Sequence, residues 1–247
     1  MLLAASAGCA SSFRYDPDDA APPPARLTPT TEPSREGAQF NSVGSSFQSV
    51  FIEYPSRFVD LFRRDTPSAS AVALEDPKLA DRRRTAIVAL ADRRFGKAPP
   101  YTTRYAQMAQ FDNDPSGRAT AIRALNRSRD GTAVGVFIGG LADESPAVRL
   151  EAAKALSNIP DAAAAPALLK LFQNPAEPLD NRVAAADALR QYRSLENARA
   201  LVNVLADRDF ALSWQARQSL RTMTGEDKRY DQSAWLSVLT GPNGLAG

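Results

Sequence analysis

The sequence Asp-Glu-Ser-Pro-Ala-Val-Arg-Leu-Glu-Ala-Ala-Lys-Ala-Leu-Ser-Asn, residues 143–158, decides the fold of this 247-residue chain. Its first four residues are typical of a turn. Ala152 and Leu156 stand four positions apart, so they lie on the same face of a helix. The stretch therefore predicts a turn followed by one helix with a small-residue face, and its pattern recurs along most of the chain.

The pattern occurs five times when the chain is aligned on a single leucine. These anchor leucines are spaced by 35, 31, 33 and 31 residues, and they are Leu90, Leu125, Leu156, Leu189 and Leu220. Four positions before each anchor stands an alanine: Ala86, Ala121, Ala152, Ala185 and Ala216. We expect the leucines to fill the core and the alanines to let neighbouring helices approach closely. A constant period in this range predicts stacked supersecondary units.

Two charged positions accompany the anchors. Seven positions before the anchor, the first four copies carry Arg83, Arg118, Arg149 and Arg182, and the fifth carries Ser213. Thirteen positions before it stand Asp112, Asp143 and Asp207, with Pro77 and Ala176 in the other two copies. A turn aspartate can cap the following helix, or it can accept hydrogen bonds from the arginine. We expect repeated pairs of this kind to form an Asp–Arg ladder between units.

Shorter apolar segments lie between the anchored helices, at residues 133–141, 165–172 and 198–205, and they predict two antiparallel helices per unit. The motif Leu-Ala-Asp-Glu-Ser-Pro-Ala-Val-Arg-Leu-Glu-Ala-Ala-Lys-Ala-Leu resembles the HEAT-like repeat of the short bacterial, phycobilisome-lyase type, over residues 76–226. The resemblance implies an all-α, right-handed α-solenoid of about five stacked antiparallel helix pairs. A generic alanine-rich bundle, the alternative, does not explain the constant spacing of arginine and leucine.

The first nine residues, Met-Leu-Leu-Ala-Ala-Ser-Ala-Gly-Cys, resemble the end of a bacterial lipoprotein signal, in which the cysteine becomes the lipid-bearing residue. This predicts lipid attachment at Cys9, the chain's one cysteine, and a place in the cell envelope facing the periplasm or the outside. Ser6 stands where leucine is commonest, and the basic segment expected of a secretory signal is missing. The alternative is a free cysteine in an unstructured terminus. No apolar run of 18 residues follows, so no other segment is expected to span a membrane.

The regions flanking the repeats carry their own patterns. Residues 10–43 are rich in proline and polar residues, which predicts a disordered linker. Within residues 44–75, aromatic side chains recur at helical spacing, which predicts amphipathic helices that cap the open end of the array. Those aromatic residues are Phe47, Phe51, Tyr54, Phe58 and Phe62. A helix at a membrane surface is the alternative. Residues 227–240 predict a C-terminal capping helix that begins after Asp231 and buries Trp235, and residues 241–247 a frayed tail.

The composition excludes several kinds of chemistry. The chain has no histidine and one cysteine, so it cannot build a Ser-His or Cys-His nucleophile pair or a common zinc site. HEAT-like relatives that hydroxylate deoxyhypusine hold di-iron through His-Glu pairs, which this chain cannot supply. Relatives that act on bilins match in pattern, but the pattern alone does not give a bilin pocket. Relatives that act on DNA use a basic surface, whereas here Asp76, Asp81 and Asp92 stand among the basic clusters 82–84 and 93–94. We expect no enzymatic activity and no cofactor.

A resemblance to HEAT-like stacks implies that the second helix of each unit lines the concave side. Residues two before and two after the anchor would then project there. The resulting strip consists of Arg123, Arg127, Lys154, Asn158, Asp187, Gln191, Gln218 and Thr222. It is polar and changes from basic to neutral along the stack, which suits a protein or peptide of matching charge. Ordinary solvated helix surface is the alternative.

The chain is also similar in arrangement to HEAT-repeat lipoproteins of planctomycete-type bacteria. We therefore expect a non-catalytic protein-binding scaffold, anchored to a membrane through lipid at Cys9 only. Its net charge of +2 demands no polyanionic partner, and we expect no nucleic acid. The first alternative is an accessory or chaperone factor of the cofactor- or bilin-lyase-like class. The second is a cytoplasmic HEAT protein that binds nucleic acid.

Overall fold

The computed structural model describes residues 67–241 and 244–245. The signal with Cys9, the linker and residues 44–66 of the predicted capping helices lie outside this range. Within it, the regular structure is entirely helical, without strands. The α-helices are α3 (Pro67–Leu74), α4 (Ala80–Ala91), α5 (Tyr101–Phe111), α6 (Pro115–Ser128), α7 (Val134–Gly140), α8 (Pro146–Asn158), α9 (Ala165–Gln173), α10 (Leu179–Leu189), α11 (Leu195–Asn203), α12 (Phe210–Thr224) and α13 (Gln232–Thr240). Three short 3-10 helices are η2 (Phe95–Lys97), η3 (Gly131–Ala133) and η4 (Ala162–Ala164).

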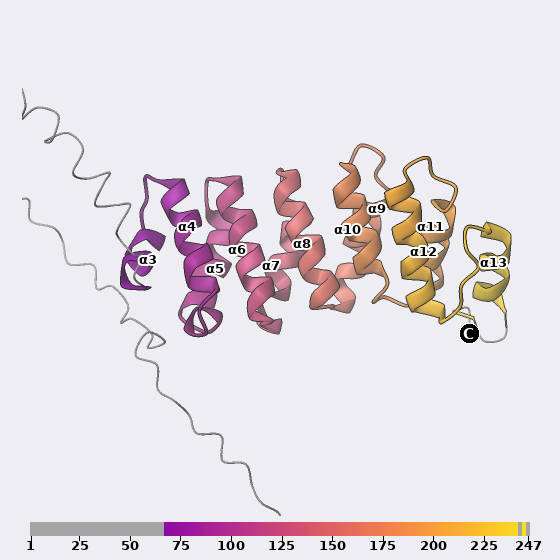
Figure 1. Ribbon diagram of the computed structural model, residues 1–247, viewed down its shortest axis with the longest axis horizontal. Coiled ribbons are helices and arrows are strands. Elements are labelled where there is room, and N and C mark those ends of the chain that lie inside the picture. Colours follow the sequence, from indigo (N-terminus) through magenta and orange to yellow (C-terminus); the bar gives the residue numbers. More distant parts are fainter. Residues whose placement is uncertain (1–66, 242–243, 246–247) are drawn as a thin grey trace, which may run out of the picture.

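The helices form two layers that run the length of the molecule (Figure 1). Helices α4, α6, α8, α10 and α12 pack side by side in that order and make what we call the even layer. Helices α3, α5, α7, α9 and α11 each pack against the even-layer helix that follows them, and α13 packs on α11. The predicted all-α solenoid of about five stacked helix pairs is confirmed.

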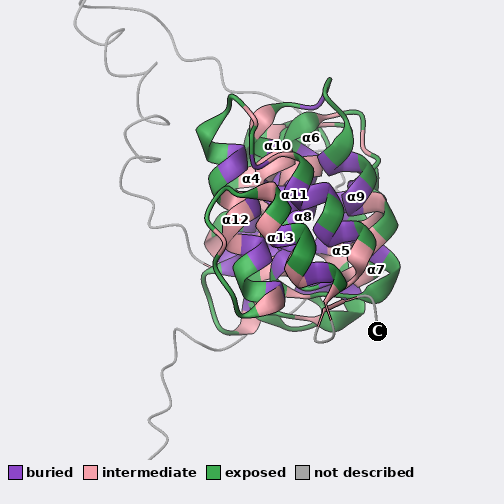
Figure 2. Ribbon diagram, turned by 90° about the vertical axis from the view of Figure 1, so that its right-hand side faces the viewer, coloured by how far each residue is buried: buried purple, intermediate pink, exposed green. Residues whose placement is uncertain are grey.

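The anchor leucines lie between the two layers. All five are in even-layer helices, and each is at most 1% exposed. The alanines four positions earlier are at most 3% exposed. Close packing is visible at Gly140 of α7, where an added Cβ would lie 3.1 Å from the Cβ of Ala152 on α8. Figure 2 shows buried residues inside the stack and exposed residues on its outer surfaces.

Helix ends follow the repeat as well. The residue five positions after the anchor caps the next helix, because the side chains of Asp130, Asp161 and Ser194 accept hydrogen bonds from backbone N–H groups two or three residues on. Gly225 ends α12 with a φ of 79°, a left-handed conformation that glycine adopts without strain.

The C-terminal helix has the predicted cap and core residue. Asp231 accepts a hydrogen bond from Ala234 N–H, and Trp235 is fully buried with its indole N–H donating to Arg229 O at 2.9 Å. At the other end, α3 packs on α4 much as α5 packs on α6. Pro67–Leu74 is therefore the first helix of the first pair, although the sequence placed residues 44–75 in a separate capping region.

Candidate binding surface

The described part of the chain contains no group of three or more acidic, histidine or cysteine residues placed to hold a metal ion. In the same residues, no helix combines the length and the apolar character needed to cross a membrane. Side chains on the outer faces of the two layers form the candidate binding surface.

An ion-pair ladder connects the turns of successive repeats. Arg83 donates from Nε and Nη2 to the Asp112 carboxylate at 2.9 and 2.6 Å, and Arg118 donates to Asp143 at 2.8 and 2.9 Å. Each arginine also donates from Nη1, to Asp76 O and Asp112 O respectively, at 2.9 Å. One guanidinium thus ties the turn of its own repeat to the carboxylate of the next, and the predicted ladder is confirmed for these two rungs.

The later rungs differ from the prediction. Arg149 pairs at 2.8 Å with Glu177, one residue after the Ala176 that breaks the aspartate pattern. Arg182 lies 4.0 Å from Asp207 and directs its Nε–H to Phe172 O at 3.1 Å instead. The ladder therefore continues through a glutamate in the third rung and is weak in the fourth.

The ladder aspartates do not cap helices. Asp112, Asp143 and Asp207 each accept a hydrogen bond from the N–H two residues on, at 2.9, 2.8 and 3.0 Å, which tightens the turn before the helix. Burial alone would raise the pKa of Asp143, but hydrogen bonds from Arg118 and from Ser145 N–H outweigh it and hold that pKa below its ordinary value. The pKa of Asp112 is lowered in the same way, against its burial, by Arg83 and Asp114 N–H.

The basic part of the predicted strip is held by carboxylates. Arg123 of α6 donates to Glu151 of α8 at 2.9 and 3.1 Å, and Lys154 lies 3.4 Å from the same carboxylate. Arg127 pairs with Asp92 at the end of α4. The Glu151 side chain is only 7% exposed; its burial would raise its pKa, but Arg123 and Lys154 hold the pKa below the ordinary value. Arg123 and Arg127 therefore connect neighbouring helices, whereas Lys154 pairs within α8.

The rest of the strip shows the same behaviour. Asp187 accepts from Ser157 Oγ at 2.6 Å and from Gln215 Nε2 at 2.9 Å, which joins α8, α10 and α12. The four remaining strip residues also make hydrogen bonds. Asn158 donates to Asn126, Gln191 donates to Ser157 O, Thr222 donates to Gln218 O, and the Gln218 side chain accepts from Arg221. Seven of the eight strip residues thus lie on even-layer helices, Gln191 lies in the turn after α10, and most of the eight link neighbouring helices. Their role in binding stays a prediction.

Beyond this strip, the even layer exposes two large aromatic side chains on α12. Phe210 and Trp214 stand one turn apart on α12 and are 70% and 44% exposed. Leu179 and Val183 of α10, which are partly buried, occupy the equivalent positions one repeat earlier. We call these four residues the aromatic face. Sequence analysis missed it, although the position six before the anchor carries a large apolar residue in three successive copies, Leu150, Val183 and Trp214.

Comparison with known proteins agrees with this repeated geometry. Residues 103–181 match the family model of HEAT repeats. The chain contains HEAT repeats. No curated protein sequence matches it.

Three solved structures show a similar solenoid. The complex of CpcE and CpcF of phycocyanin lyase from Nostoc sp. is 19% identical over 87% of this chain and 76% of that chain, with a TM-score of 0.58. YibA of Escherichia coli is 23% identical over 75% and 69%, with a TM-score of 0.56. An engineered protein is 18% identical over 64% and 79%, with a TM-score of 0.51. At these identities the likeness concerns the fold.

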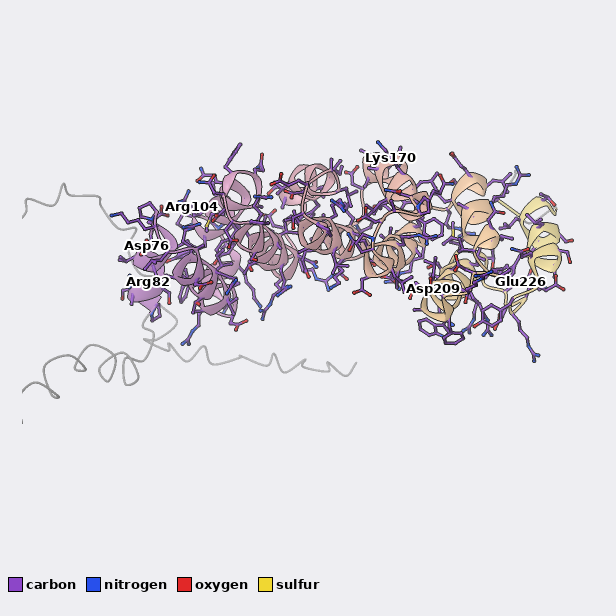
Figure 3. All side chains as sticks on the ribbon, turned by 90° about the horizontal axis from the view of Figure 1, so that it is seen from above. Asp76, Arg82, Arg104, Lys170, Asp209 and Glu226 are labelled. Atoms are coloured by element: carbon purple, nitrogen blue, oxygen red, sulfur yellow. The ribbon has the colours of Figure 1, made fainter. Side chains whose placement is uncertain are left out.

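The opposite layer of this HEAT-like protein holds a cleft of about 830 Å³ between α9 and the start of α11. Leu169 and Lys170 of α9 line one wall, and Tyr192 and Asn197 lie across from them. Tyr192 is 9% exposed, its hydroxyl accepts a hydrogen bond from Asp161 N–H at 3.3 Å, and burial raises its pKa. In Figure 3, Lys170 and Asp209, the residue before α12, lie at opposite edges, so the cleft and the aromatic face are on different surfaces.

Proposed function

We propose that this protein is a non-catalytic scaffold that binds another protein or peptide through the even layer, with the aromatic face as its centre. The observation that carries the proposal is the exposure of Phe210 and Trp214, at 70% and 44%, on a single helical face. Aromatic side chains of this kind dominate the energy of protein interfaces when a partner covers them. Left in water, they contribute little to the stability of the array itself.

The basic part of the even layer supports a partner with carboxylates. Arg123 and Lys154 share one carboxylate, Glu151, so two positive charges face one negative charge at this place. Both cations keep about half of their side-chain surface exposed, 57% and 49%. A partner that places apolar groups on the aromatic face and an acidic group near α6 and α8 would satisfy both regions.

Photo-crosslinking tests the proposed surface. Benzoylphenylalanine replaces Trp214 in one variant and Phe111 in a control, because Phe111 is 76% exposed but ends α5 in the other layer. Irradiation of native envelopes should give a discrete protein adduct from position 214 and none of that mass from position 111. Equal adducts from both positions, or none from 214, contradict the proposal.

The proposal includes export and a lipid anchor at Cys9, supported by the sequence Ser-Ala-Gly-Cys at residues 6–9. Because one acyl chain anchors weakly, stable attachment would need more than one chain on the modified cysteine. Cells fed a clickable palmitate analogue should label the wild type, and Cys9→Ser should remove the label. Unchanged labelling of the variant rejects the anchor without touching the binding proposal.

A second candidate is an accessory factor for a cofactor or pigment. The cleft between α9 and α11 favours it, together with the likeness in fold to the phycocyanin lyase complex. Protein purified from its native source would then carry a chromophore with visible absorbance. Loss of that absorbance in Leu169→Glu, a change in the cleft wall, with retention in Trp214→Ser, would support the accessory factor over the scaffold.

A further inference from the structure

The aromatic face lies beside two exposed carboxylates, those of Asp180 and Asp209. Asp209 precedes Phe210 and is exposed, and its side chain makes no hydrogen bond or ion pair with any residue that the structure describes. The same holds, within the described residues, for exposed Asp180 in the first turn of α10. Because α10 and α12 are neighbours in one layer, these first turns lie side by side. Arg208 is the exposed cation of the same turn, so one negative charge remains in excess.

Two exposed aromatic rings beside carboxylates fit a particular ligand chemistry. Proline-rich segments bind on aromatic side chains, because their rings pack flat on the aromatic faces and their backbone is already extended. The fixed φ of proline lowers the entropy lost on binding. An arginine in such a segment adds a charge-assisted contact to a carboxylate. The aromatic face with Asp180 and Asp209 therefore suits a proline-rich segment that carries an arginine.

The chain contains one such segment, Pro-Pro-Pro-Ala-Arg-Leu-Thr-Pro, at residues 22–29. We propose that residues 22–29 bind the aromatic face of their own molecule, with the prolines on Phe210 and Trp214 and Arg26 against Asp209. The segment occupies the surface until a partner displaces it.

The length of the connecting chain permits this contact. Residues 30–66, 37 in number, join the segment to the start of α3. Fully extended they span about 120 Å, and about 90 Å if residues 47–62 form the predicted helix. Successive even-layer helices from α4 to α12 cover about 40 Å at the usual spacing of 8–10 Å. As a flexible chain, 37 residues have an r.m.s. length of about 35 Å, close to this span, and such a match gives a high effective concentration near the face.

This inference deepens the proposed function and rests on it, because it assigns regulation to the same face. It predicts that the free protein hides its own binding surface. Fluorine NMR of the full chain with 5-fluorotryptophan tests it, since the chain has two tryptophans. Trp214 reports on the face, and Trp235, which is fully buried, serves as the internal reference.

The test variant is Pro23→Ser with Arg26→Glu, and the matched control is Pro33→Ser with Arg35→Glu in the same region. The test variant should shift the Trp214 resonance and leave that of Trp235 in place, whereas the control should shift neither. A synthetic peptide of residues 20–31, added in excess, should return the Trp214 resonance of the test variant to its wild-type position. A peptide with every proline replaced by serine should not.

Three results overturn the inference. The first is a Trp214 resonance at the same position in the wild type and the test variant. The second is a Trp214 resonance that depends on protein concentration, which would indicate that the segment of a second copy binds the face. The third is a Trp214 resonance that moves only when anionic phospholipid vesicles are added. The experiment needs no partner, so it is separable from the proposed function. No adduct from position 214 together with the expected NMR shifts would reject partner binding at the aromatic face and support the contact with residues 22–29.

Discussion

The first three repeats and the last two differ in what their equivalent positions do. From α4 to α8 the ladder arginines make short, shielded contacts, as in Arg118 with Asp143, whose side chains are 9% and 15% exposed. Further along, the rung from Arg182 to Asp207 opens to 4.0 Å, and the fifth copy replaces the arginine with Ser213. Exposed aromatic side chains occur on α12, where the ladder has ended. Regularly spaced leucines and arginines hold the first repeats together, and the aromatic face lies in the last two repeats, where the ladder weakens and ends.

The largest expected effect comes from an anchor leucine, because both regions depend on the core. Leu156→Ala removes a fully buried side chain between the layers and should lower the free energy of unfolding by about 3–4 kcal/mol. Urea denaturation measures it, with Leu236→Ala as control, since Leu236 is 40% exposed on α13. A loss below about 1 kcal/mol in Leu156→Ala would contradict a continuous core.

The next prediction separates strong from weak rungs. Arg118→Ala leaves the Asp143 carboxylate with only the Ser145 N–H donor and removes the guanidinium donor of Asp112 O, so it should cost about 2–3 kcal/mol. Arg182→Ala loses one backbone hydrogen bond and a loose ion pair, so we expect about 1 kcal/mol or less. Equal losses in the two variants, measured by thermal or urea unfolding, would remove the contrast between the regions.

Acid should act on the same rungs. The pKa values of Asp112 and Asp143 are lower in the folded protein than the ordinary value of 3.8, so the unfolded state binds more protons as the pH falls. Their stabilising effect is complete above about pH 5, begins to weaken near pH 4 and is lost as the pH falls through the folded pKa values. The free energy of unfolding should therefore decrease below about pH 4, and less steeply in Asp143→Asn. An equal slope in the variant would show that other groups govern the acid response.

The smallest effect on stability is expected at the aromatic face. Phe210→Ser combined with Trp214→Ser should change the free energy of unfolding by no more than about 0.5–1 kcal/mol, because both side chains are largely exposed. Affinity for a captured partner should nevertheless fall more than about tenfold. Calorimetric titration measures that affinity, and Val72→Ser, at an exposed apolar site on α3, is the matched control. A destabilised double variant would show that the pair belongs to the core.

Sequence reasoning gave the repeat because its signals are local and periodic. The anchors, the small residues and the first two ladder rungs follow from spacing alone. The helix Tyr101–Phe111 was missed, although Tyr101, Tyr105 and Met108 share one buried face. Glu177 was missed because it stands one position out of register with the other ladder acids.

The strip shows what spacing cannot reveal. Arg123 was expected to face a partner, and it also holds Glu151 across the gap between α6 and α8. That contact depends on how far one helix is shifted along the next, and a single sequence does not state the shift. Trp214 was overlooked because the search used positions two before and two after the anchor, and this residue lies six before it.

Affinity and stability measured together on two variants test the division between ladder and aromatic face most directly. Partner affinity and urea unfolding would be compared for the wild type, Arg118→Ala and Phe210→Ser with Trp214→Ser, under conditions in which all three are folded. The account predicts that Arg118→Ala loses stability and keeps its affinity, and that the aromatic variant loses affinity and keeps its stability. Loss of affinity in Arg118→Ala with unchanged affinity in the aromatic variant would contradict it.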